Sequence, residues 1–277
     1  MQIALPIIMF VFGAAIGSFL CCQVRRLHER ELNRKKLGPR SVCLHCHRQL
    51  KWHDNIPLFS WCMLRGRCRY CHHKIGFLEI ASELGLALAF LAITLRLVLT
   101  TRAYYPQFAD TFLGITAINW GIFAITLLLI ISLGFLAIYD GAYGELPSFC
   151  LCIALICAII LAVVQGTYQI SETGFDWSRI IMPLASALVL GGIYLALYLV
   201  SRGRWVGDGD WLLGTAIGIA LGHPFLALIA LLIANLSATI VSAPTVKKRG
   251  SEIHFGPFLV FAFVVTYTFS DFFISMI

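Results

Sequence analysis

Two aspartates of an otherwise apolar chain have the residue type and position for catalysis at a membrane. Asp140 stands in "AIYDGAYGELP" (137–147) and Asp210 in "RWVGDGDWLLG" (204–214), each beside a long uncharged run. An ionised carboxylate inside a bilayer costs about 2.5–3.5 kcal/mol, so acidic residues there usually mark function. Two carboxylates that pack together share a proton, so one can activate water while the other protonates a scissile carbonyl or departing amine. The pair therefore favours hydrolysis of a peptide bond.

The same motif has a plainer interpretation. An aspartate at a helix start is most often an N-cap, so Asp208 or Asp210 could cap the helix that follows. The flanking glycines, Gly207 and Gly209, would give the backbone freedom beside the carboxylate and let a substrate backbone approach closely.

Four cysteines indicate a metal site. "CLHC" (Cys43, Cys46) and "CRYC" (Cys68, Cys71) are paired C-x-x-C motifs with 21 residues between them, close to the spacing of a four-cysteine zinc site. Zinc would secure a loop whose own core is small. The alternatives are two disulfides or reduced thiols. Four histidines lie next to the motifs: His45, His47, His72 and His73. They could replace a cysteine as metal ligand, but we expect them to be solvated or to lie beside the metal without binding it.

The elements that must position these residues are transmembrane helices. The chain has 277 residues, of which 59% are hydrophobic and 13% charged, and several uncharged runs approach the roughly 20 residues that cross a bilayer. The sequence predicts an all-α polytopic membrane protein with about eight spans: 1–22, 80–100, 116–139, 147–166, 180–200, 211–222, 224–243 and 256–277. "GHP" at 222–224 predicts a turn between the sixth and seventh spans.

Basic residues predict the orientation and the domains. Of the 21 Lys and Arg, thirteen lie in 23–80, two in 201–210 and three in 244–255. By the positive-inside rule these segments face the cytoplasm, and the net charge of +7 then needs no nucleic acid as partner. We expect a first transmembrane helix (1–22), a cytoplasmic zinc-knuckle subdomain (23–80) and a membrane domain (81–277). Between the knuckles, Trp52 and Trp61 are predicted to lie at the membrane surface.

Together these motifs resemble the type IV prepilin peptidases, which are polytopic aspartic peptidases of bacterial inner membranes. The resemblance rests on "GDGD" (207–210), on Asp140 seven residues before Pro147, on the paired C-x-x-C loop and on "DNIPLFSW" (54–61). "GSFL" (17–20), Glu83 and "FGPFL" (255–259) extend it over most of the chain.

The resemblance implies a function and site residues. Members remove the basic leader of type IV prepilin or pseudopilin precursors at the cytoplasmic face, and many then methylate the new N-terminus with S-adenosylmethionine. Asp140 and Asp210 take the two catalytic positions, and Cys43, Cys46, Cys68 and Cys71 take the structural zinc positions. Asp208 falls on a variable position of the motif, so catalysis is not assigned to it.

Some positions differ from the family pattern, and two other functions stay open. Ser148 and Leu212 stand where the family commonly has Asp and Lys, and Cys21 where it usually has Asn; none of these removes a catalytic carboxylate. A transporter or assembly scaffold could use the two aspartates to bind a proton or cation. An intramembrane peptidase of the presenilin type shares GxGD and has the "YD" found at 139–140, but lacks the paired C-x-x-C loop.

Overall fold

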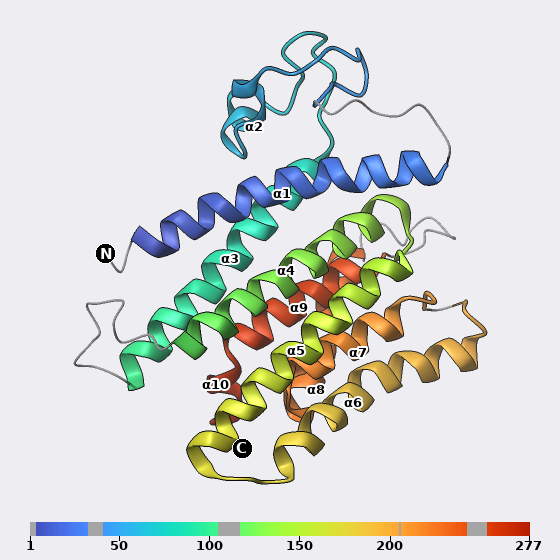
Figure 1. Ribbon diagram of the computed structural model, residues 1–277. Coiled ribbons are helices and arrows are strands. Elements are labelled where there is room, and N and C mark those ends of the chain that lie inside the picture. The colour runs from blue at the N-terminus through green and yellow to red at the C-terminus, as the bar shows by residue number, and fades with distance from the viewer. Residues whose placement is uncertain (1–3, 33–40, 105–116, 205, 243–253) are drawn as a thin grey trace. The chain divides into compact units, whose positions relative to one another are not determined.

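The computed structural model describes residues 4–32, 41–104, 117–204, 206–242 and 254–277, and these residues are helical with short connections (Figure 1). They divide into two compact units, residues 1–94 (unit 1) and 95–277 (unit 2). Across the described residues the β-structure consists of two isolated bridges, Val42 with Gln49 and Arg67 with Lys74. The predicted all-α class is confirmed.

Unit 1 consists of a helix, a loop and most of a second helix. α1 (Ala4–Glu31) extends beyond position 22, at which the first span was predicted to end, and α3 (Phe77–Tyr104) begins just before the second predicted span. Between them lie η1 (Trp52–Asn55) and α2 (Phe59–Met63).

The two long helices of unit 1 pack at backbone contact. A Cβ atom on Gly13 would lie 2.7 Å from the carbonyl oxygen of Leu86, and one on Gly17 would lie 2.5 Å from that of Ser82. Small residues four apart allow such an approach between membrane helices. The two helices that flank the loop are therefore packed closely against each other.

Unit 2 holds the remaining helices. After the end of α3 come α4 (Ala117–Tyr143), α5 (Ser148–Thr173), α6 (Ser178–Ser201), α7 (Asp210–Leu221), α8 (Pro224–Ser242), α9 (Gly256–Thr268) and α10 (Ser270–Ile274). α5 packs on both α4 and α7, and α9 also packs on both. The ends of α4 and α7 are thereby held next to each other, although the two helices lie far apart in the sequence.

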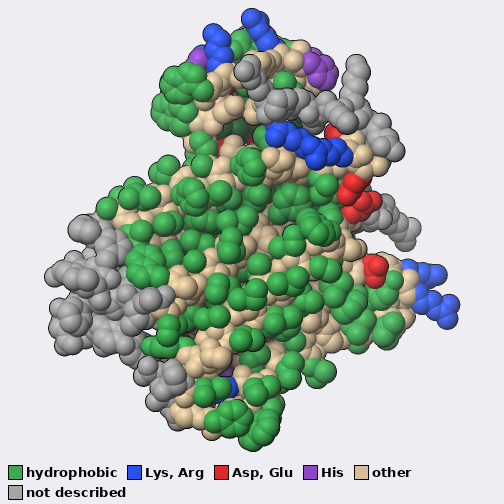
Figure 2. Space-filling view, in the orientation of Figure 1, with side chains coloured by type: hydrophobic (Ala, Val, Ile, Leu, Met, Phe, Trp, Pro, Cys, Tyr) green, Lys and Arg blue, Asp and Glu red, His purple; other side chains and the backbone are tan. Residues whose placement is uncertain are grey.

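Among the described residues, six helices are long and apolar enough to cross a membrane: α1, α3, α4, α5, α6 and α8. α7 and α9 are apolar but shorter, with 12 and 13 residues. Large hydrophobic side chains cover most of the visible face of the helices (Figure 2). Within the described residues the structure thus supports a protein with several membrane spans, while the count of eight stays a prediction.

The predicted turn at "GHP" is confirmed. α7 ends at Leu221, and Gly222 adopts a left-handed φ of 70°. α8 then begins at Pro224. Glycine permits the left-handed backbone that closes one helix, and proline fits the first turn of the next.

Candidate active site and zinc centre

The four predicted metal ligands in unit 1 form a single cluster. The Sγ atoms of Cys43, Cys46, Cys68 and Cys71 all lie within 4.8 Å of one another, and those of Cys43 and Cys71 are 3.8 Å apart. A tetrahedral zinc ion with Zn–S bonds of about 2.3 Å holds its sulfur ligands about 3.8 Å apart. The cluster fits one zinc ion bound by four thiolates, and the neighbouring histidines are not needed as ligands.

Both knuckles close with the same hydrogen bonds. In the first, the N–H of Cys43 donates to the carbonyl of Arg48 at 3.0 Å, and the N–H of His47 donates to the carbonyl of Cys43 at 2.9 Å. In the second, the N–H of Cys68 donates to the carbonyl of His73 at 2.9 Å. Each C-x-x-C turn is therefore a tight local hairpin that aims its two thiols at one point.

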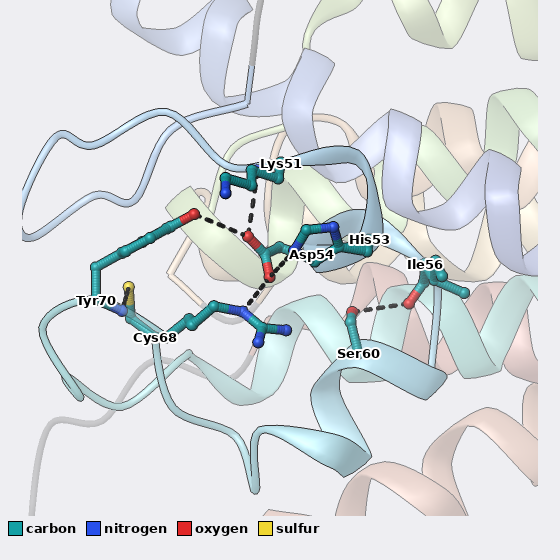
Figure 3. A network of polar contacts seen from close by, with 8 residues as sticks. Lys51, His53, Asp54, Ile56, Ser60, Cys68 and Tyr70 are labelled. Carbon is teal, nitrogen blue, oxygen red and sulfur yellow. Dashed lines mark hydrogen bonds and ion pairs between the residues drawn. The ribbon is translucent and has the colours of Figure 1, made fainter.

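A buried carboxylate anchors the loop beside the cluster (Figure 3). The side chain of Asp54 is 2% exposed; its Oδ1 accepts from Nε of Arg69 at 2.6 Å, and its Oδ2 accepts from the N–H of Lys51 at 3.2 Å and the hydroxyl of Tyr70 at 3.4 Å. Burial opposes the charged form, but the hydrogen bonds from Arg69 and Lys51 outweigh it, so the pKa of Asp54 lies below its usual value. Asp54 thus ties η1 to the second knuckle.

The two tryptophans of the loop differ. Trp52 is 79% exposed, and its place at the membrane surface stays a prediction. The ring of Trp61, in contrast, lies against Gly66, and its indole nitrogen is buried. Trp61 is half-buried, and its ring fills the space that the left-handed Gly66 (φ 65°) leaves open, so its role as a surface anchor stays a prediction.

Asp140 lies in unit 2, in the last turn of α4, and is 6% exposed. Its Oδ2 accepts a hydrogen bond of 2.8 Å from the N–H of Gly256, the first residue of α9. The N-terminus of a helix favours a negative charge. A Cβ atom on Gly256 would lie 2.8 Å from the same oxygen, so glycine is required for this contact.

Asp210 is the first residue of α7 and is also 6% exposed. Its Oδ2 accepts a hydrogen bond of 2.9 Å from the N–H of Gly207. The N-cap of α7 is Gly209, without a side-chain capping bond, so Asp210 does not cap the helix as the alternative interpretation supposed. Its carboxylate is instead held by the turn that precedes the helix.

Gly209 of the motif makes a close contact that the sequence did not indicate. A Cβ atom on Gly209 would lie 2.6 Å from Cβ of Leu146. This contact joins the turn before α7 to the segment "ELP" between α4 and α5. Gly209 therefore lets the two aspartate-bearing segments touch.

The structure brings the two predicted aspartates together. Asp140 lies close enough to Asp210 to interact with it electrostatically. Asp208, two residues earlier, is exposed. The arrangement offers a buried carboxylate pair, the minimum needed for acid–base catalysis without a metal.

One residue of this site was missed by the sequence analysis. The ring of His254 packs on Gly144 at the end of α4, where a Cβ atom would lie 2.8 Å from Cε1, and His254 interacts electrostatically with Asp140. Only its place next to "FGPFL" could have indicated it, because Asp140 and Gly256 are 116 residues apart in the sequence.

Comparisons with known proteins identify the family of the chain. Residues 11–97 match the Bacterial Peptidase A24 N-terminal domain. The Prepilin leader peptidase/N-methyltransferase of Dickeya chrysanthemi is 30% identical over 275 residues, which cover 91% of this chain and 88% of that protein. The proteins of the same name from Aeromonas hydrophila and Bacillus subtilis are 28% and 26% identical, over 92% and 97% of this chain and 87% and 96% of their own lengths. No solved structure matches the chain. Because the likeness to the Dickeya protein extends over most of both chains, this protein belongs to the prepilin leader peptidase/N-methyltransferase family.

Proposed function

We propose that the protein is an aspartic endopeptidase that removes the leader from type IV prepilin or pseudopilin precursors. The observation that carries the proposal is the buried pair Asp140 and Asp210, held at the adjoining ends of α4 and α7. The family membership supports the choice of substrate. No metal is required for the cleavage step itself.

In the proposed mechanism the two carboxylates have complementary protonation states. The ionised one takes a proton from water, whose oxygen attacks the scissile carbonyl carbon; the protonated one donates its proton to the carbonyl oxygen. Collapse of the tetrahedral intermediate breaks the C–N bond, and the departing amine takes a proton from the pair. The N–H groups of Gly256 and Gly207 each hold one carboxylate oxygen, so the other oxygen of each group is oriented for the reaction.

The orientation in the membrane follows from the basic residues. If the segment 23–80 faces the cytoplasm, α3 would cross the membrane outward and α4 would cross back, so Asp140 at the end of α4 and Asp210 beside it would lie on the cytoplasmic side. The precursor's apolar helix would enter the bilayer of the inner membrane while its basic leader stays at the cytoplasmic surface. This places the scissile bond at the depth of the carboxylates.

The proposal includes two bound groups. Zinc held by Cys43, Cys46, Cys68 and Cys71 would be structural, because all four positions are filled by protein. S-adenosylmethionine would supply a methyl group for the new N-terminus, in keeping with the names of the relatives.

A cleavage assay tests the proposal. Purified protein is incubated with a prepilin precursor, and the product is weighed by mass spectrometry. We expect a mass loss equal to the leader, and loss of cleavage in Asp140→Asn and Asp210→Asn at unchanged expression and membrane insertion. Unchanged proteolysis in either variant would refute the catalytic assignment.

A further inference from the structure

The two carboxylates of the pair have nearly matching surroundings. Each accepts one backbone N–H, from Gly256 for Asp140 and from Gly207 for Asp210. Each also lies at the N-terminus of a helix, since Gly256 begins α9 and Asp210 begins α7. Backbone N–H groups and helix N-termini favour a negative charge. These contacts alone do not decide which carboxylate is ionised when the pair holds one proton.

The helix that carries Asp140 adds an unfavourable effect on its charge. Asp140 lies in the last turn of α4, which ends at Tyr143. The C-terminal end of a helix carries a partial negative charge and favours cations. A positive group near this helix end would offset that effect and stabilise the ionised form of Asp140.

His254 lies at this end of α4. Its ring packs on Gly144, where an added Cβ atom would lie 2.8 Å from Cε1 and 3.0 Å from Nδ1 of the ring. Gly144 has a left-handed φ of 71°, and its N–H donates to the carbonyl of Asp140 at 2.8 Å. His254 also interacts electrostatically with the Asp140 carboxylate. A protonated imidazole here meets two negative partners, the helix end and the carboxylate, and both favour its charge.

The position of this ring follows from the packing of α9. Successive residues of the segment 254–256 contact three parts of unit 2. His254 lies on the end of α4, the ring of Phe255 is 5.5 Å from that of Tyr194 in α6, and Gly256 donates to Asp140. One short segment therefore brings both the imidazole and a backbone N–H to the same aspartate.

The other titratable groups at this end of unit 2 do not replace His254. The helices contribute one more carboxylate and three phenols, and a phenol carries no positive charge in either form: Asp210, Tyr139, Tyr143 and Tyr194. α8 carries no charged residue. The connections contribute exposed charges, which solvent screens: Glu145, Arg202, Arg204 and Asp208. Within the part of the chain that the structure describes, His254 is the cation that acts on Asp140.

We infer that His254 is a positioning residue whose protonated ring holds Asp140 as the ionised member of the pair. Asp140 is then the base of the reaction and Asp210 the acid. The inference rests on the proposed function, to which it adds the role of each carboxylate and a residue that sets these roles.

This assignment fixes the path of each proton. Asp140 takes a proton from water, whose oxygen forms the new bond to the scissile carbonyl carbon, and Asp210 gives its proton to the carbonyl oxygen. When the C–N bond breaks, the departing amine takes the proton from Asp140, and Asp210 recovers one from a hydroxyl of the intermediate. The pair returns to its starting state, and His254 keeps its proton throughout.

The pH dependence of kcat/KM for precursor cleavage tests the inference. On the acid side the rate falls as the base of the pair is protonated. In His254→Gln this acid limb should move to higher pH by about half to one unit, because the ionised Asp140 loses a nearby positive charge. Below the limb, cleavage should be about three- to tenfold slower than in wild type. Near pH 8, where histidine side chains are mostly neutral, the rates should agree.

Two further variants separate charge from shape and from a general effect of histidine loss. His254→Lys keeps a positive charge and should restore the wild-type acid limb. His223→Gln is the matched control, because His223 is the other histidine of unit 2. It follows the far end of α7, about 18 Å along that helix from Asp210. Its acid limb should match that of wild type.

Nuclear magnetic resonance of full-length protein with labelled histidine tests the same coupling without substrate. Because electrostatic coupling is reciprocal, the charge of Asp140 also holds the proton on His254. We expect the His254 signal, identified by its absence in His254→Gln, to lose its proton at lower pH in Asp140→Asn than in wild type. The signal of His223 should not change. Equal titration of His254 in the two proteins overturns the inference.

The outcomes separate this inference from the proposed function. Cleavage by wild type with an unmoved acid limb in His254→Gln overturns the inference and leaves the peptidase function standing. A limb that moves in His254→Gln and is not restored in His254→Lys does the same, because shape rather than charge would then act. Absence of cleavage in wild type refutes the proposed function, and the histidine titration then decides by itself whether His254 holds the charge of Asp140.

Discussion

At the scale of residues, burial separates the two aspartates of the "GDGD" motif. Asp210 is 6% exposed and Asp208 is exposed. Solvent keeps an exposed carboxylate ionised at little cost, whereas a buried carboxylate with a second one nearby is protonated more readily. The proposed chemistry is therefore assigned to the last residue of the motif.

Substitutions at the motif should reflect this difference. We expect Asp208→Asn to retain a substantial fraction of precursor cleavage. Asp210→Glu should lose about a hundredfold in rate, because the extra methylene displaces the carboxylate by about 1 Å. Initial rates of precursor cleavage check both. An Asp208→Asn variant as inactive as Asp210→Asn would mean that Asp208 shapes the pair or holds the basic leader.

Gly256 provides a second test at this scale. Gly256→Ala would place a methyl group 2.8 Å from Oδ2 of Asp140, so the carboxylate must move. We expect kcat for cleavage to fall by about ten- to a hundredfold, with thermal unfolding little changed. Gly121→Ala, in the same helix as Asp140 but with no atom within 4 Å of its added methyl group, should cleave at the wild-type rate. Equal rates in the two variants would show that the Gly256 contact does not position Asp140.

At the scale of elements, two features hold the loop between α1 and α3 in its fold: the cluster of four cysteines and the buried carboxylate of Asp54. If the four thiolates bind zinc, purified protein should contain about one zinc per chain by elemental analysis. Replacing Cys43 and Cys46 by serine should lower the zinc content and increase proteolysis within 41–75. Zinc-free protein after purification without chelators would indicate reduced thiols instead. Cleavage should survive in part, since both aspartates of the proposed catalytic pair belong to unit 2.

The second feature, Asp54, predicts how the stability of this loop depends on pH. The folded pKa of Asp54 lies below its unfolded value of about 3.9, so its stabilisation is complete above that value and is lost as pH falls through the folded pKa. Asp54→Asn should destabilise the loop by about 1–3 kcal/mol. The loss of loop stability in Asp54→Asn relative to wild type, measured by limited proteolysis of 41–75, should be constant from pH 6 to 8. A deficit that disappears within that range would show that Asp54 is not ionised in the folded protein.

The sequence singled out the four clustered cysteines and the two buried aspartates, but it did not indicate the contacts that hold them. Cys43 to Cys71 lie within one loop, so their spacing alone indicated a common metal. Gly256 and His254 depend on α9 packing against α4, a contact between distant segments that no local pattern encodes. The end of α1 was missed because its charged last turns look like loop sequence, although they continue the helix to Glu31.

At the scale of the whole molecule, the distribution of basic residues makes the orientation testable. Single cysteines at 30–32, in a background without native cysteines, should be protected from an impermeant reagent added to intact cells. Cysteines at 174–176, in the connection between α5 and α6, should be labelled. The reverse pattern would place the carboxylate pair on the outer side and contradict a cytoplasmic cleavage site.

The two C-x-x-C turns close with matching hydrogen bonds, and this indicates an order in which the four-cysteine site forms. Each hairpin closes over a few residues, so each can form as soon as it is synthesised, at little cost in chain entropy. Joining the hairpins closes a much longer loop, and this is the step that the metal secures. Zinc would then be captured by two turns that already exist, and a nascent chain could complete the site before α4 has left the ribosome.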